Sequence, residues 1–397
     1  GIPDLLDECA NRGVKFVHIF SGRLSETGNR KAANLEADIL RKAKALNIRL
    51  IGPNCMGIFH PRLGISYSDD LPKEPGDVGG LFQSGGLSIL FSRYGGLQGL
   101  RFSKIISFGN ALDLDECDFL EYLAHDEETK IITCYIEGAK DGARLLDVLR
   151  EATSVKPVVM LKGGKGIIGK KTAGSHTSAL AGSDAVWQTA LRQTGVIQVD
   201  DVNQLVDVVT LFSSLPSIKG RRAAVIGASG GQSVLAADAC ERVGFELPPL
   251  PSEVKEVLKS RMPELSDWIG NPIDVSAAGA FFRPGEMLEM VAKNPEFDFT
   301  IVNIDEGAPV HQEMWCDIIG GVIDSAIDLS QKQVKPIIAV LSGGKIHQQQ
   351  FSEWRWQFLA DLRSRLIAAH VPVYSTMIEA VTALKRYIDF CITREDG

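Results

Sequence analysis

The sequence predicts an α/β protein whose parallel sheets are covered by helices on both faces. Three observations support this fold class. Short apolar segments rich in β-branched residues alternate with amphipathic segments of helical length. The short segments are apolar on both sides, which is typical of parallel strands buried between two layers of helices. A strand–turn–helix pattern also occurs twice in the same order along the chain.

The expected elements follow from these apolar runs. Residues 1–13 read as a helix that no strand precedes. Strands are expected within residues 14–20, 48–54, 78–84, 104–110, 131–138, 156–164, 222–229, 298–307, 335–344 and 372–376. Helical patterns lie between them. Ligands of such sheets bind at the carboxyl ends of the strands, so the turns that follow the strands are the first place to look for function.

The internal repeat sets the domain organisation. Three pairs of segments correspond: 80–100 with 224–245, 131–142 with 300–311, and 155–165 with 334–345. Joints rich in Pro, Gly and Ser lie at residues 71–77 and 213–220. We therefore expect three α/β domains with parallel sheets, over residues 1–73, 76–216 and 220–397.

Composition excludes several classes of protein. The 397 residues carry a formal net charge of −8, which argues against a nucleic-acid surface. No apolar run is long enough to span a membrane, and the start lacks the pattern of a signal peptide. The seven cysteines are scattered without a C-x-x-C pair, so neither a disulfide framework nor a bound metal is expected. A reducing, cytoplasmic location fits this usage.

Two strand-end turns combine small and polar residues. In "LFQSGGLSIL", Ser84, Gly85 and Gly86 end a strand and open a helix, whose unpaired N–H groups and dipole form an anion site. The alternative is that the small residues only allow a tight turn. In "SFGNALDLD", Gly109 and Asn110 follow another strand, and the aspartates after them are expected to cap the next helix.

A carboxylate and a histidine complete the set of polar candidates. Glu137 in "YIEG" follows a buried strand, where it can orient an imidazole or remain a solvated loop residue. His176 lies in "TAGSHTSALAGS", between a Gly/Lys-rich loop and a helix for which Ser183 is the expected N-cap. An unprotonated imidazole is a nucleophile that forms covalent intermediates, and small neighbours let it approach an electrophile closely. The alternative is an ordinary surface-loop histidine.

These motifs together resemble one family, the nucleoside-diphosphate-forming acyl-CoA synthetases, relatives of succinyl-CoA synthetase. The stretch from "SHTSALAGS" through "GVIQV" is similar to the family's phosphohistidine segment, and "IGPNCMG" and "GNPIDV" also match. The resemblance covers nearly the whole chain and is to the α subunit or α-like half. It implies that residues 1–73 form a partial Rossmann-like CoA-binding domain without its usual first strand and glycine turn. It also implies two flavodoxin-like, doubly wound domains: the CoA-ligase domain with the phosphohistidine loop over residues 76–216, and a second CoA-ligase domain over residues 220–397.

The resemblance also implies a reaction and site residues. Phosphate converts acyl-CoA to an acyl phosphate, His176 takes the phosphoryl group with support from Glu137, and a nucleoside diphosphate receives it. Residues that would bind phosphate are Ser84, Gly85, Gly86, Gly109 and Asn110. Residues that would line the CoA site are Phe20, Ser21, Gly22, Pro53 and Asn54.

The resemblance also implies a partner, and two other classes of function remain as alternatives. No segment is left to build a nucleotide-grasping domain, so the Mg-nucleotide site is expected on an ATP-grasp β subunit or domain, and the protein is expected to be an oligomer. A non-catalytic acyl-CoA-binding or regulatory module is the first alternative. A flavin or dinucleotide oxidoreductase is the second, although no G-x-G-x-x-G with a downstream acidic residue supports it.

Overall fold

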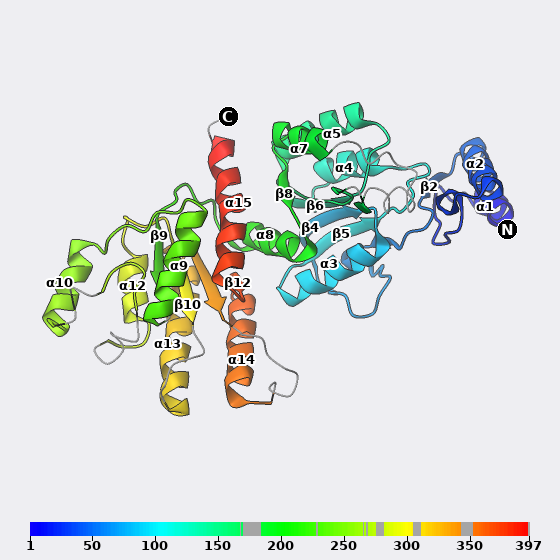
Figure 1. The fold of residues 1–397 in the computed structure, drawn as a ribbon. Coiled ribbons are helices and arrows are strands. Elements are labelled where there is room, and N and C mark those ends of the chain that lie inside the picture. The colour runs from blue at the N-terminus through cyan, green and yellow to red at the C-terminus, as the bar shows by residue number, and fades with distance from the viewer. Residues whose placement is uncertain are drawn as a thin grey trace. The chain divides into compact units, whose positions relative to one another are not determined.

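The computed structural model of the chain divides into two compact units, residues 1–209 and 210–397 (Figure 1). The structure describes residues 1–166, 168–169, 184–227, 229–264, 266, 269–274, 282–304, 311–342 and 352–395. The loop at 172–183, with His176 and the expected cap Ser183, lies outside these ranges. In the described part of the chain, no helix is long and apolar enough to cross a membrane. All seven cysteines are free.

The first unit opens with a small layer of two helices on a parallel pair of strands. Its elements are α1 (Ile2–Asn11), β1 (Phe16–His18), α2 (Arg30–Ala45) and β2 (Arg49–Ile51), with a short 3-10 helix, η1 (Ser25–Thr27), before α2. The side chain of Asn29 caps α2 by accepting from the Lys31 N–H at 2.8 Å. Buried apolar residues join the helices to the strands: Leu6, Ile39, Ala43, Ile48 and Leu50.

A six-stranded sheet forms the main body of the first unit. Its strands are β3 (Gly57–Phe59), β4 (Pro75–Phe82), β5 (Phe102–Ser107), β6 (Ile131–Ile136), β7 (Val158–Lys162) and β8 (Ile197–Val199). They lie in the order β3-β5-β4-β6-β7-β8. All pairs are parallel except β3 with β5, which is antiparallel. The sheet is therefore parallel, as predicted, with an antiparallel edge strand that the apolar pattern did not reveal.

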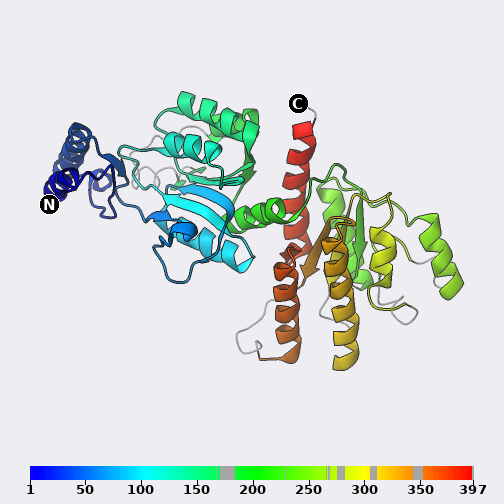
Figure 2. The ribbon, with the colours of Figure 1, turned by 180° about the vertical axis from the view of Figure 1, so that it is seen from behind.

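Helices cover both faces of this sheet (Figures 1 and 2). They are α3 (Gly85–Leu97), α4 (Glu116–His125), α5 (Gly142–Val155), α7 (Asp184–Gln193) and α8 (Val202–Ser214), and the 3-10 helix η2 (Pro61–Leu63) follows β3. On the face of α3, the Phe91 ring lies 5.2 Å from Phe82 and 5.7 Å from Phe102. Helices α4, α5 and α7 share another core. Every residue of β5 and β7 is buried, and the buried side chains include the polar ones of Ser103, Lys104, Ser107 and Lys162.

The second unit repeats the doubly wound arrangement on a smaller sheet. Among its described residues, the strands β9 (Ala223–Ile226), β10 (Phe299–Ile304), β11 (Ile337–Leu341) and β12 (Val373–Tyr374) are all parallel, in the order β12-β11-β10-β9. Its helices are α9 (Gly230–Arg242), α10 (Ser252–Arg261), α12 (Glu286–Ala292), α13 (Gln312–Gln331), α14 (Trp354–Ala368) and α15 (Met377–Glu395). Helix α9 packs with α15, while α12, α13 and α14 pack in series on the opposite face (Figures 1 and 2).

The repeat seen in the sequence is also a structural repeat. Strand β4, a turn and α3 correspond to β9, a turn and α9, and a Lys-Pro pair precedes both β7 and β11. The fold class predicted from the sequence is confirmed: a small Rossmann-like layer and two flavodoxin-like sheets. The domain boundaries at residues 73–76 and 216–220 stay a prediction.

An asparagine side chain ties three segments of the second unit together. Asn271 accepts from the Val225 N–H at 3.0 Å and donates to the carbonyl oxygens of Ala223, at 2.8 Å, and Pro248, at 3.0 Å. Since a hydrogen bond contributes about 1 kcal/mol net, Asn271→Ala is expected to lower the free energy of unfolding by about 3 kcal/mol in urea denaturation. Asn294→Ala loses one bond, to the Glu296 N–H. Equal losses in the two variants would contradict the prediction.

Candidate functional site

Ser84, Asn110 and Glu137 follow the neighbouring strands β4, β5 and β6 and so lie at the carboxyl edge of the six-stranded sheet. In the parallel register, Phe82 at the end of β4 lies beside Ser107 of β5 and Tyr135 of β6. Ile136, at the end of β6, lies beside Lys162 of β7. The turns that follow these strands therefore open on the same edge. Ligands of open α/β sheets bind at this edge.

Helix α3 presents its N-terminus at this edge. Ser84 is the N-cap, and its hydroxyl oxygen accepts from the Leu87 N–H at 3.3 Å. A Cβ on Gly85 would lie 2.7 Å from Cγ of Met56, so only glycine lets that side chain pack here. Gly86 is exposed, and the nearest atom to a Cβ there would be Oγ of Ser84 at 4.0 Å. The first N–H groups of the helix are thus open to an anion.

Glu137 follows β6 and is held from three directions. Its N–H donates to Oε1 of Gln83 at 2.6 Å, and its carbonyl oxygen accepts from Nζ of Lys162 at 2.7 Å. Its Oε1 accepts from the Tyr135 hydroxyl at 3.0 Å. Its Oε2 is buried and has no hydrogen-bond partner in the described part of the chain. Because a buried polar atom normally has a partner, this oxygen is the atom of the site that a ligand or another residue would satisfy.

The turn after β5 contacts the turn after β2. Gly109 has φ +55°, and a Cβ there would lie 2.3 Å from the carbonyl oxygen of Pro53. Asn110 is buried; its Oδ1 accepts from Nδ2 of Asn54 at 3.3 Å, and its Nδ2 donates to Oε2 of Glu26 at 2.8 Å. Two candidates for phosphate, Gly109 and Asn110, thus contact two candidates for CoA, Pro53 and Asn54, and these turns form one connected group.

The loop after β1 completes this group. The Asn54 N–H donates to the carbonyl oxygen of Ser21 at 3.1 Å. A Cβ on Gly22 would lie 2.8 Å from Oδ1 of Asn54, so the two turns approach too closely for a side chain. Phe20 is exposed on 65% of its surface. An exposed aromatic ring beside backbone turns is a surface on which an aromatic ligand group can stack.

Hydrogen bonds favour the charged form of Glu26, the acid that contacts Asn110. Burial by itself would raise the pKa of Glu26, but backbone N–H groups of its own turn and the Asn110 amide donate to the carboxylate and lower the pKa overall. At neutral pH Glu26 is therefore an acceptor that fixes the orientation of the Asn110 amide. Its Oε1 also accepts from the Leu24 N–H at 3.0 Å.

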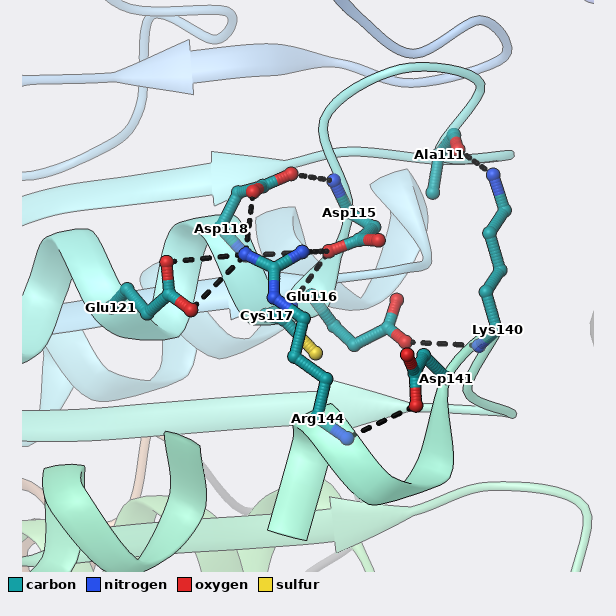
Figure 3. Close-up of polar contacts among 9 residues, drawn as sticks. All are labelled: Ala111, Asp115, Glu116, Cys117, Asp118, Glu121, Lys140, Asp141 and Arg144. Atoms are coloured by element: carbon teal, nitrogen blue, oxygen red, sulfur yellow. Dashed lines mark hydrogen bonds and ion pairs between the residues drawn. The ribbon is translucent and has the colours of Figure 1, made fainter. Parts of the chain in front are cut away.

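Two loops of the site are joined by a lysine (Figure 3). The Lys140 ammonium donates to the carbonyl oxygen of Ala111, and the Lys140 N–H donates to Oε1 of Glu116 at 3.2 Å. Glu116 is 1% exposed, and burial raises its pKa. These bonds link the loop that carries Asn110 to the loop that carries Glu137.

An arginine of α5 binds the start of α4 nearby (Figure 3). The Arg144 guanidinium contacts Asp118 at 2.8 Å, Glu121 at 3.1 Å and Asp115 at 3.5 Å. Asp115 caps α4, as expected for one of the two aspartates after Asn110. The other, Asp113, instead binds Arg49 at 2.8 Å and so fixes β2.

Sequence reasoning missed four residues that the structure adds to the site: Glu26, Gln83, Tyr135 and Lys162. Tyr135 lies two positions before Glu137, and this spacing places both side chains on the same side of a strand, which was a usable signal. Gln83 directly precedes Ser84, so its position beside a predicted site residue was a second usable signal. Nothing local marks Glu26, which meets Asn110 across 84 residues of sequence.

The loop predicted to carry the nucleophile is outside the described residues, so the structure does not position His176. Lys165, just before that loop, forms an ion pair with Asp200 at 2.8 Å. Within the described ranges, no group of three or more His, Cys, Asp or Glu side chains is arranged to hold a metal ion.

Comparison with known proteins identifies two domain families in the first unit. Residues 75–212 match the family described as the succinyl-CoA ligase like flavodoxin domain, and residues 1–61 match the CoA binding domain. An ADP-forming acetate–CoA ligase of Methanocaldococcus jannaschii is 39% identical over 276 residues, which are 69% of this chain and 38% of the relative. The α subunit of ADP-forming acetate–CoA ligase II of Pyrococcus furiosus is 34% identical over 305 residues, covering 76% of this chain and 65% of that subunit.

A solved structure extends the similarity to both units. The dinucleotide-forming acetyl-coenzyme A synthetase 1 of Ca. Korarchaeum cryptofilum, in complex with phosphate and ADP, has a TM-score of 0.80 and 27% identity; the match covers 99% of this chain and 81% of that chain. This chain spans only 38% and 65% of the two curated relatives. It belongs to the family of nucleoside-diphosphate-forming acyl-CoA synthetases, whose CoA-binding and succinyl-CoA ligase-like domains it contains.

Proposed function

We propose that the chain is the CoA-ligase component of an acyl-CoA synthetase that forms a nucleoside triphosphate. The reaction is acyl-CoA, phosphate and nucleoside diphosphate to carboxylic acid, CoA and nucleoside triphosphate, and it is reversible. The observation that carries the proposal is the buried Oε2 of Glu137, which has no partner among the described residues and lies at the same sheet edge as the N-terminus of α3. A carboxylate that lacks a partner suits an imidazole N–H, and a helix N-terminus suits a phosphoryl group.

The chemistry divides into two transfers. A phosphate oxygen attacks the thioester carbonyl, and the CoA thiolate leaves, which gives an acyl phosphate. A ring nitrogen of His176 then attacks phosphorus, and the carboxylate leaves, so that the energetic group stays on the protein instead of being lost to water. Glu137 accepts the N–H of the other ring nitrogen and stabilises the positive ring that forms.

The proposal also assigns binding roles, which rest on the resemblance and are supported by contacts between the turns. We assign phosphate binding to Ser84, Gly85, Gly86, Gly109 and Asn110. We assign contacts with CoA to Phe20, Ser21, Gly22, Pro53 and Asn54. The direct hydrogen bond between Asn54 and Asn110 supports this division, because it links a turn of one group to a turn of the other and would hold thioester and phosphate close together.

The nucleotide step belongs to another part of the enzyme. We propose that an ATP-grasp subunit or domain holds the Mg-nucleotide and accepts the phosphoryl group from His176. The chain matches proteins named as α subunits, which supports a multi-subunit assembly. Residues 220–397 would form the second CoA-ligase domain of this assembly.

The decisive experiment labels the histidine from the acyl-CoA side. The full-length protein, with its nucleotide-binding partner or domain, is incubated with acetyl-CoA and [³²P]phosphate, and acid-labile protein-bound phosphate is mapped. We expect label on His176, and a His176→Ala variant labelled only to background. His125→Ala is the matched control, since His125 is an exposed helix residue that bonds the Glu121 carbonyl, and it should label like the wild type.

Two results would contradict the proposal. Equal labelling of His176→Ala and the wild type would assign the phosphoryl group to another residue. Tight binding of acetyl-CoA by an intact protein that never becomes labelled would instead identify a non-catalytic acyl-CoA-binding module.

A further inference from the structure

The proposed function uses Oε2 of Glu137, while Oε1 accepts a hydrogen bond from Tyr135. Tyr135 and Glu137 are two residues apart on the same side of the chain at the end of β6, and the tyrosine hydroxyl lies 3.0 Å from Oε1. Oε2 is buried without a partner in the described part of the chain. The two oxygens of this carboxylate therefore have different environments.

The tyrosine is the donor in this bond at neutral pH. Burial raises the pKa of Tyr135, and the negative charge of Glu137 and the hydrogen bond to it raise the pKa further. The hydroxyl therefore keeps its proton and donates a hydrogen bond to Oε1 of the carboxylate, which accepts. A hydrogen bond to a charged acceptor is stronger than a neutral one, and it restricts rotation of the carboxylate.

The lack of a side chain at Gly163 leaves space for the Tyr135 hydroxyl. A Cβ on Gly163, just after β7, would lie 2.6 Å from the Tyr135 oxygen. A side chain at position 163 would therefore displace the hydroxyl. The backbone of Glu137 is held separately, by Gln83 and Lys162. Removing the hydroxyl alone thus frees the carboxylate without freeing the loop.

We propose that Tyr135 is a positioning residue for the phosphoryl-carrying histidine: its hydroxyl holds Oε1 of Glu137 and so reserves Oε2 for the imidazole N–H. This inference rests on the proposed function of Glu137 and His176. It adds that the tyrosine acts only through the carboxylate and contacts neither the phosphoryl group nor CoA.

The test is the single-turnover rate of His176 labelling from acetyl-CoA and [³²P]phosphate. Tyr135→Phe should slow labelling about 10- to 100-fold, the effect expected for losing a hydrogen bond to a charged group, with unchanged affinity for acetyl-CoA. Tyr387→Phe is the matched control: it removes a buried hydroxyl that bonds Leu215 and Pro216, and it should label at the wild-type rate. Gly163→Ala, which displaces the hydroxyl while keeping Tyr135, should reproduce the defect.

A double-mutant cycle separates positioning from general damage. Glu137→Gln should be slow, and Tyr135→Phe combined with Glu137→Gln should be no slower, because the tyrosine then has no carboxylate to hold. A wild-type rate for Tyr135→Phe, or multiplied defects in the double variant, would overturn the role of Tyr135 alone. A wild-type rate for Glu137→Gln would overturn the role assigned to Glu137 in the proposed function, and the inference with it.

Discussion

Gly109→Ala is expected to destabilise the first unit by more than about 3 kcal/mol and to abolish acyl-CoA binding. The new Cβ would lie 2.3 Å from the carbonyl oxygen of Pro53 and 2.4 Å from that of Asn54. Both are backbone atoms, so no side-chain rotation can relieve the overlap. The turn that carries Asn54 must move away, and its bond to Asn110 is lost with it.

Gly13→Ala separates this overlap from backbone strain. Gly13 has φ +74°, close to the +55° of Gly109, but a Cβ there would meet no described atom within 4 Å. Its cost should be only the left-handed conformation of an alanine, about 1–2 kcal/mol. Urea denaturation compares the stabilities, and calorimetry with acetyl-CoA compares the binding. Equal stability of the two variants would show that the contact between the turns is not tight.

Lys104→Met is expected to lower the free energy of unfolding by about 3–5 kcal/mol, because it leaves the Asp126 carboxylate, which is 10% exposed, without its ion-pair partner. The Lys104 side chain is 5% exposed, and its ammonium lies 2.7 Å from Asp126 and 3.1 Å from Glu128. The matched control is Lys73→Met, which replaces an exposed loop lysine and should change stability by less than about 0.5 kcal/mol. A loss as small as that of the control would contradict the prediction.

The ion pair between Lys104 and Asp126 also predicts that the free energy of unfolding depends on pH. Burial by itself would raise the pKa of Asp126, but hydrogen bonds from Lys104 and Thr129 and the Lys104 charge lower it overall. A lowered folded-state pKa gives stability that is complete above the unfolded value, near 4, and is lost as the pH falls through the folded value. The wild type should therefore lose stability on acidification below about pH 4 more steeply than Lys104→Met. Parallel curves would show that this pair does not contribute.

Local patterns predicted the sheets and the edge on which the site lies. Strand β7 is buried along its whole length and is apolar from Val158 to Leu161, so its apolar run was visible without any partner. Strand β5 is equally buried, but Ser103 and Lys104 interrupt its apolar residues. The turns at Ser84, Asn110 and Glu137 could be placed at one edge because parallel strands end together. The antiparallel strand β3 was not predicted, since three residues after a turn carry too little periodicity to be recognised.

The contacts inside the site required the structure. Asn110 bonds Asn54 and Glu26, which are 56 and 84 residues away in the sequence. Lys104 likewise pairs with Asp126 and Glu128, which are distant in the sequence. No local sequence pattern indicates either set of contacts. The roles of the individual site residues, including His176, stay predictions that the labelling and mutation experiments test.

The sequence by itself determined the fold class, the internal repeat and the identity of the strand-end motifs, because apolar periodicity and turn chemistry are local properties. The tertiary structure decided which oxygen of Glu137 is occupied, why Gly109 must be glycine, and which acid orients Asn110. These depend on distances between segments far apart in the chain. Such distances are fixed only when the helices pack on the sheet and bring the turns at its edge within hydrogen-bond reach.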